Sequence, residues 1–216
     1  MIVRPRAALS ALTTVFFSLL FIPASALAQG ASNFVPDWVQ KSNDIAYQIL
    51  ESGAQFAPEF AGQTGVGGYD EEIFDLGPNL YERQMKVSKD NLDMLQGLLA
   101  TEEDPRVRQD IQIMIKSVED NIEASTINYE SVLPYGNLSG LVFAGFRGLL
   151  DKQVPLERHK AALVRLRKYT GREDGYEPLT ELAKIRLTER MKEPDLINPF
   201  IGEVVQDLER APVMIA

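Results

Sequence analysis

The stretch from Asp104 to Leu150, DPRVRQDIQIMIKSVEDNIEASTINYESVLPYGNLSGLVFAGFRGLL, decides the fold of this chain. Asp104 followed by Pro105 is typical of a helix N-cap and a first helical position, where a missing N–H costs nothing. Apolar residues then recur every three or four positions, which places them on one face of a long helix. They are Val107, Ile111, Met114, Val118 and Ile122. Pro134 and Gly136 interrupt the pattern, and an almost uncharged helix is predicted after them.

The segment before Asp104 predicts the other half of a helical hairpin. Pro78 restarts a helix after a stretch rich in glycine and proline, and this helix ends near Thr101. Its apolar stripe consists of Met85, Leu92, Leu95 and Leu99. Only a few residues separate the two helices, so we expect them to be antiparallel neighbours. At 1.5 Å per residue the hairpin should be ~35 Å long, the longest rigid unit of the chain.

Five further helices complete the prediction. They cover about 37–56, a segment from Leu138, a segment from Val154–Pro155, Pro178 to about Met191, and a segment after Asn198–Pro199. The first should turn Ala46, Ile49, Leu50 and Gly53 to one side and use Trp38 as a packing anchor. No run alternates with period two over a useful length, so no strand is predicted. The sequence therefore predicts an all-α fold of about seven helices, in an antiparallel array with a long central hairpin and no significant sheet.

The helix that begins at Val154–Pro155 carries an apolar set and a basic set. We expect the apolar set to face inward: Ala162, Leu163, Leu166 and Tyr169. We expect Arg158, Arg165 and Arg167 on the outer face. The full basic set is Arg158, Lys160, Arg165, Arg167, Lys168 and Arg172. Such a set suits an anionic substrate, but in an acidic chain it more often pairs with carboxylates of neighbouring helices.

The first 28 residues have the pattern of a secretory signal peptide. Arg4 and Arg6 form a positive segment, residues 7–22 are apolar, and Ala26-Leu27-Ala28 is an A-x-A cleavage site. We expect cleavage after Ala28. The alternative is an uncleaved membrane anchor, which is less favoured because the apolar run is short for a bilayer span.

Beyond the signal segment, the sequence predicts a flexible leader over residues 29–41 and one helical lobe over residues 42–216. The chain has no cysteine, so its stability must come from a packed core rather than from disulfides. A-x-A processing without disulfides fits a bacterial periplasm, and we predict a periplasmic or secreted protein. The formal net charge of −9 disfavours nucleic acid and anionic membranes as partners. No stable membrane anchor is expected after cleavage.

Short motifs that resemble catalytic patterns are all incomplete. His159 is the only histidine, whereas a zinc-protease helix needs two at i and i+4, so we interpret it as a surface residue. Ser139 has the wrong spacing for a Gly-x-Ser-x-Gly nucleophile and is predicted to cap a helix. After Gly140 and Gly145, Phe146-Arg147 stands where a phosphate loop has Lys-Ser/Thr. These glycines, with Ala144 and Gly148, are instead expected to allow close helix packing.

A glycine-rich loop, residues 65–68, is followed by the acidic residues Asp70, Glu71 and Glu72. These carboxylates would repel a dinucleotide phosphate. Weak calcium binding is conceivable, but the ordered alternation of a calcium loop is missing, which favours a solvated acidic loop. We therefore predict no catalytic, cofactor-binding or metal-binding residue in this chain. An enzyme with an unrecognised carboxylate site stays open only because Asp and Glu are plentiful.

Several segments together resemble the N-terminal part of the bacterial family called domain of unknown function 885. The matching pieces, between Ser42 and Leu208, are SNDIAYQILE, APEFAGQTGVGGYDEEIFDLGP, DPRVRQDIQIMI, YESVLPYGN and ALVRLRKYTGREDGYEPLTELAKIRLTERM. Full-length members of that family resemble gluzincin-type zinc metallopeptidases, with a His-Glu-x-x-His helix far downstream. This sequence ends before any such helix, so no zinc ligand of the family can be carried over to it.

The resemblance implies the N-terminal helical lobe of a secreted zinc-peptidase-like protein, without the zinc motif and inactive alone. The expected partner is a missing C-terminal catalytic region, or another protein or peptide, and zinc is expected only in full-length relatives. An apolar stripe near the end of the sequence fits such a partner. It consists of Phe200, Val204, Val205 and Leu208. The alternative is a stand-alone periplasmic helical module that binds peptides or proteins.

Overall fold

The computed structural model describes residues 35–215, with side chains through Met214. Eight α-helices are formed in this part of the chain, and a 3-10 turn, η2 (Gly62–Thr64), follows the second of them. The helices are α1 (Asp37–Ala54), α2 (Pro58–Ala61), α3 (Leu80–Thr101), α4 (Pro105–Ser131), α5 (Leu138–Leu149), α6 (Leu156–Tyr169), α7 (Leu179–Arg190) and α8 (Ile201–Ile215). Residues 35–215 contain no strand, and one isolated parallel bridge joins Val132 to Ile197. The all-α prediction is confirmed, and the helix beyond the expected seven is the four-residue α2.

The structure tests only part of the N-terminal predictions. The predicted signal peptide, residues 1–28, lies outside the described residues. α1 begins at Asp37, whose negative charge suits a helix N-terminus. Residues 37–41, which the sequence-based division assigned to the leader, are therefore helical. Between residues 35 and 215, no helix combines the length and the apolar character that a membrane crossing requires.

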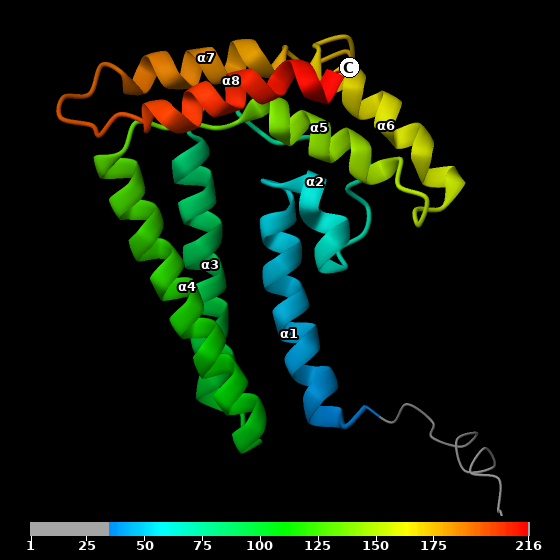
Figure 1. Ribbon diagram of the computed structural model, residues 1–216. Coiled ribbons are helices and arrows are strands. Elements are labelled where there is room, and N and C mark those ends of the chain that lie inside the picture. The colour runs from blue at the N-terminus through cyan, green and yellow to red at the C-terminus, as the bar shows by residue number, and fades with distance from the viewer. Residues whose placement is uncertain (1–34, 216) are drawn as a thin grey trace, which may run out of the picture. The chain divides into compact units, whose positions relative to one another are not determined.

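The α3–α4 hairpin forms as predicted, and Figure 1 shows α1, α3 and α4 running alongside one another. The Asp104 carboxylate accepts a 2.9 Å hydrogen bond from the Arg106 N–H, so it caps α4. The Arg108 guanidinium donates to the carbonyls of Leu99 and Glu102, at 2.7 and 2.8 Å, which satisfies free acceptors at the end of α3. A short loop with both helix ends satisfied holds the hairpin rigid.

The main core lies between this hairpin and α1. Its buried residues are Ile45, Leu95, Val107, Ile111 and Val118. Trp38 packs against this core, and the Arg106 guanidinium lies 5.0 Å from its ring, so its predicted role as a packing anchor is confirmed. The predicted inner face of α1 is partly wrong, because Ile45 is buried whereas Leu50 is 43% exposed.

Helices α5 to α8 lie across one end of these three helices (Figure 1). α5 contacts α2, α6 and α8, and a small core forms where it meets α6. At the other side, Tyr129 of α4 stacks on Tyr81 of α3, with ring centroids 3.8 Å apart. The Arg190 guanidinium of α7 lies 4.1 Å from the Tyr129 ring and donates to the Tyr129 carbonyl. This cation–π contact ties α7 to the end of the hairpin.

The start of α5 differs from the prediction. The N-cap is Asn137, whose side chain accepts a 2.7 Å hydrogen bond from the Gly140 N–H. Ser139 does not cap the helix; its hydroxyl donates to the Asn137 side chain at 2.9 Å. Asparagine is as good a cap as serine, and here it lies directly before the first helical residue.

The inner face of α6 also differs from the prediction. Ala162 and Tyr169 are buried as expected, but Leu163 is 57% exposed and Leu166 is 40% exposed. Arg165, which was placed on the outer face, is only 3% exposed. The helix turns a mixed polar and small-residue face inward because that face meets backbone acceptors of the loop between α2 and α3. These contacts form the site described next.

Candidate functional site

The buried Arg165 guanidinium is the centre of a polar network. Its Nε donates to the Glu72 carbonyl at 3.0 Å, and its Nη1 donates to the Gly145 carbonyl at 3.0 Å. Its Nη2 donates to the carbonyls of Pro58 and Tyr69, at 3.1 and 2.9 Å. Arginine presents five N–H donors in a rigid fork, which suits several acceptors at once. One side chain therefore fixes α5, α2 and the α2–α3 loop relative to α6.

Two further basic residues of α6 hold carboxylates of the same loop. Arg158 makes a bidentate contact with Asp70, with both N–O distances 2.6 Å, and this hydrogen bonding lowers the pKa of Asp70. The Lys168 ammonium lies 3.0 Å from the Glu72 carboxylate and 4.7 Å from the Tyr176 ring centroid. The Arg167 guanidinium lies 4.0 Å from the Glu173 carboxylate. The predicted pairing of the basic set with carboxylates is thus confirmed for three members, although the carboxylates come from loops rather than from helices.

Glu59 and Tyr169 form a buried pair beside Arg165. They are 8% and 4% exposed, and the Tyr169 hydroxyl donates to Glu59 Oε1 at 2.7 Å. The Phe74 N–H donates to the same oxygen at 2.8 Å. Burial, together with the neighbouring Glu59 carboxylate, raises the pKa of Tyr169 far above its ordinary value. The phenol is therefore a neutral donor at any physiological pH.

Gly145 of α5 has no side chain, and the Glu59–Tyr169 pair occupies the space beside it. A Cβ atom at Gly145 would lie 2.5 Å from the Tyr169 hydroxyl and 2.6 Å from Glu59 Cγ. The prediction that glycines here allow close packing is confirmed at this position. It does not hold at Gly148, where a Cβ atom would meet nothing within 4 Å.

A hollow of about 430 Å³ lies beside this network, between the α2–α3 loop and the turn before α7. Its aromatic and aliphatic walls are Tyr69, Ile73, Phe74, Leu76, Tyr176 and Leu182. Three carboxylate residues also line it, Glu72, Asp75 and Glu177, together with Gln55, Gly77 and Gly175. No basic residue lines this hollow. We call it the Tyr176 pocket.

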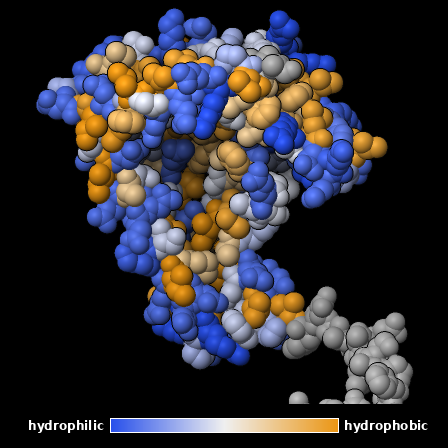
Figure 2. All heavy atoms as spheres, in the orientation of Figure 1, coloured by the Kyte–Doolittle hydropathy of each residue, from blue (hydrophilic) through white to orange (hydrophobic). Residues whose placement is uncertain are grey.

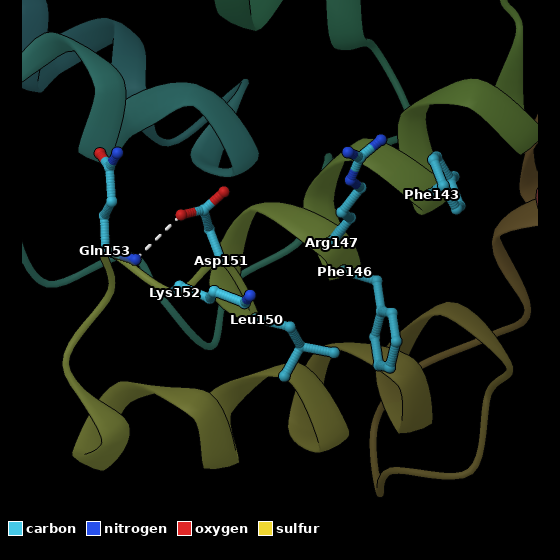
Figure 3. Close-up of a pocket in the computed structure, with 7 residues that line it drawn as sticks. All are labelled: Phe143, Phe146, Arg147, Leu150, Asp151, Lys152 and Gln153. Carbon is cyan, nitrogen blue, oxygen red and sulfur yellow. Dashed lines mark hydrogen bonds between the residues drawn. The ribbon is translucent and has the colours of Figure 1, made fainter.

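A second hollow, of about 550 Å³, lies along α5. Among the residues that line it, Figure 3 shows Phe143 and Arg147 extending to one side of α5 and Phe146 and Leu150 to the other. These are two rows of residues spaced four apart, and the groove between such rows is the kind that receives a neighbouring helix. Its lining combines apolar side chains with charges of both signs, including Lys152.

The outer side of α8 carries apolar side chains that are exposed in the described part of the chain. Ile201, Val205 and Leu208, at positions i, i+4 and i+7, are 78%, 48% and 68% exposed. We call these three residues the α8 apolar face. Figure 2 shows hydrophobic residues spread over the upper layer of the view, where α8 lies. Other exposed apolar residues lie in the connection between α7 and α8 and near the end of α8: Met191, Ile197, Phe200 and Val213.

The predicted stripe on α8 is therefore divided between two sides of the helix. Val204 is half-buried, together with Asp207 and Ala211, whereas Phe200 and the α8 apolar face are exposed. The Asp207 carboxylate also accepts a 2.7 Å hydrogen bond from the Tyr135 hydroxyl. One side of α8 thus packs against the chain, and the other side is presented to solvent.

The other residues singled out by the sequence do not come together in one site. His159 is half-buried, and its Nε2 lies 3.0 Å from the Val154 carbonyl, so it is not a fully exposed surface residue. In the acidic loop only Glu71 is solvated without an ion pair, because Asp70 and Glu72 are held by α6. Among the described residues, no group of three or more His, Cys, Asp or Glu side chains is placed to hold a metal ion.

Chemically, the network is a rigid support, and the two hollows and the α8 apolar face are surfaces suited to binding. Sequence reasoning missed the Glu59–Tyr169 pair and the buried position of Arg165. The nearest sequence signal was the spacing of Arg165, Lys168 and Tyr169 at i, i+3 and i+4, which places them on one helix face. Comparison of the chain with family models, curated proteins and solved structures finds no match.

Proposed function

We propose that this chain is a non-catalytic helical docking lobe of a secreted zinc-peptidase-like protein. In this proposal the lobe binds the catalytic region of such a protein through the α8 apolar face. The observation that carries the proposal is the exposure of Ile201 and Leu208, at 78% and 68%, on a helix whose other side is packed. The nature of the partner rests on the sequence resemblance to the domain of unknown function 885 family.

The physical support is that three exposed apolar side chains share one face of α8. Single exposed apolar side chains are normal, but contiguous apolar patches mark sites of association. Full burial of each aliphatic side chain is worth about 1.5–3 kcal/mol, so three residues on one face supply a useful part of a binding energy. Glu209, four positions after Val205, is exposed at the edge of this face. A partner with a basic residue beside its apolar centre would therefore match this surface.

The rigid network gives the lobe a second property that suits docking. Arg165 holds α5 to α6, the Glu59–Tyr169 pair holds α2 to α6, and α8 rests on α5. A partner that binds α8 therefore meets a surface that is already ordered, which lowers the entropic cost of association. In helical peptidases of the proposed design, such a lobe walls the substrate cleft and leaves the chemistry to the other half.

Purified residues 29–216 allow a direct test. We expect them to bind a hydrophobic dye or to self-associate in sedimentation velocity, because the α8 apolar face lacks its partner. The double variant Ile201→Asp/Leu208→Asp should reduce both effects. Ile113→Asp, at a 60% exposed position of α4, is the matched control and should leave them unchanged. Zinc-dependent peptide hydrolysis by this protein would contradict the non-catalytic part of the proposal.

The second candidate is a stand-alone periplasmic module that binds peptides or proteins. The Tyr176 pocket is the observation that favours it, because a hollow of about 430 Å³ with aromatic walls is of the size and character of a ligand site. A monodisperse protein that melts cooperatively without binding dye would support the module. The intact mass of the native product in a periplasmic fraction separates the two further, since a species far heavier than 24.1 kDa indicates a longer protein.

A further inference from the structure

We propose that the Tyr176 pocket binds the side chain of a basic residue, lysine or arginine, in a peptide. This inference goes beyond docking through α8, because it concerns a different surface and a different ligand. It rests on three properties of the pocket. Its walls are held in place, its lining suits an alkyl chain that ends in a cation, and one of its carboxylates makes no ion pair with a described residue.

The walls of the pocket are fixed by hydrogen bonds, two sets from residues behind the lining and one across it. On the loop side, Arg165 holds the carbonyls of Tyr69 and Glu72, and Glu59 accepts the Phe74 N–H. On the opposite side, the Tyr176 hydroxyl donates to the Glu72 carboxylate at 3.3 Å. A preformed site of this kind binds its ligand without the entropic cost of ordering its own loops.

The lining matches a basic side chain along its whole length. Lysine and arginine carry an apolar stem that packs on apolar surface while the charged end reaches polar groups. Ile73, Leu76 and Leu182 provide the apolar surface, and the Phe74 ring provides a face that attracts a cation. The Tyr176 ring already has the Lys168 ammonium 4.7 Å from its centroid, so it contributes apolar surface. An acidic ligand would meet an unpaired carboxylate and no lining cation, so the lining favours a cation over an anion.

The charged groups in and around the pocket sum to a net negative charge. Lys168 pairs with Glu72 and Arg83 pairs with Asp75, so two of the three lining carboxylates are compensated. Glu177 is exposed and makes no ion pair with any described residue. A ligand cation would therefore pair with Glu177. The α5 hollow differs, since two cationic residues, Arg147 and Lys152, and one carboxylate residue, Asp151, line it, and it serves as an internal contrast.

The test compares two short peptides on the purified full chain by two-dimensional NMR. The first is N-acetyl-Ala-Ala-Lys-Ala-Ala-amide, and the second has norleucine in place of lysine, which keeps the stem and removes the charge. We expect the lysine peptide to shift the amide signals of Gly175, Tyr176 and Phe74, and the norleucine peptide to bind more weakly. Glu177→Gln should weaken binding of the lysine peptide by about fivefold, the scale of an exposed ion pair.

The control is Glu130→Gln, which makes the same charge change at an exposed position of α4. It should leave the affinity unchanged, and both variants should keep the wild-type melting curve because neither side chain makes an ion pair in the described structure. Three results would overturn the proposal: equal affinity for the two peptides, no shift at Gly175 or Tyr176 with millimolar lysine peptide, or equal weakening by the two variants. None of these results bears on docking through α8.

Discussion

The Tyr169 hydroxyl donates a 2.7 Å hydrogen bond to the Glu59 carboxylate across 110 positions of sequence. The two residues belong to α6 and α2, and both are buried against Gly145 of α5. A charged acceptor strengthens such a bond, and burial makes its loss costly. This pair therefore joins three elements that are remote in sequence and supports one wall of the Tyr176 pocket through Phe74.

Removing the Tyr169 hydroxyl should destabilise the protein measurably. In Tyr169→Phe, the buried Glu59 carboxylate keeps only the Phe74 N–H as a donor. We expect a loss of about 1–3 kcal/mol in the free energy of unfolding, the cost of an unsatisfied buried polar group. Urea denaturation measures it. Tyr47→Phe is the control, since Tyr47 is 41% exposed and should change stability by less than about 0.5 kcal/mol.

The same tyrosine should make stability depend on pH in the alkaline range. The pKa of Tyr169 is raised in the folded state by burial and by Glu59, whereas an unfolded tyrosine ionises near its ordinary value of 10.0. The contribution is therefore fully present below pH 10 and is lost as the pH rises above it, because the unfolded chain then releases the proton first. The slope from this group approaches about 1.4 kcal/mol per pH unit.

Thermal or urea unfolding measured at several alkaline pH values tests this dependence. The difference in stability between wild type and Tyr169→Phe should shrink as the pH rises above about 10. A difference that stays constant over that range would show that the Tyr169 pKa is not raised.

Two glycines of α5 offer a matched pair of substitutions. Gly145→Ala places a methyl group 2.5 Å from the Tyr169 hydroxyl, so the buried pair must move, and we expect a loss of about 1–3 kcal/mol. Gly148→Ala lies three residues along the same helix with open space around it. It should be neutral or stabilising by up to about 1 kcal/mol, because alanine favours the helix. Equal effects at the two positions would contradict the close contact at Gly145.

The Arg165 fork should be irreplaceable by another cation. Arg165→Lys keeps the charge but offers a single nitrogen to carbonyls that lie in four directions, so at least two should lose their donor. We expect a loss of more than about 2 kcal/mol, together with faster chymotrypsin cleavage after Tyr69 or Phe74 in the released loop. Arg167→Lys, with its side chain 59% exposed, should behave like wild type in both assays.

Features that depend on neighbours in sequence were predicted well. The Asp104–Pro105 start of α4, the buried face of the hairpin and the all-α class are confirmed. Capping involves residues two or three positions apart, and helical apolar residues recur every three or four positions. Both patterns can therefore be recognised within short windows of sequence. The resemblance to a zinc-peptidase-like family, the secretion signal and the partner stay predictions.

Features that depend on remote neighbours were decided only by the tertiary structure. Arg165 was predicted to face solvent because arginines are rarely buried, yet it lies inside since Pro58, Tyr69 and Gly145 present their carbonyls to it. The same holds for α8, whose apolar residues divide into packed and exposed sets only because α5 packs against one side of the helix. A hydropathy pattern ranks which side chains prefer burial, but a buried charge becomes stable only where distant acceptors converge on it, and that convergence is a property of the assembled fold.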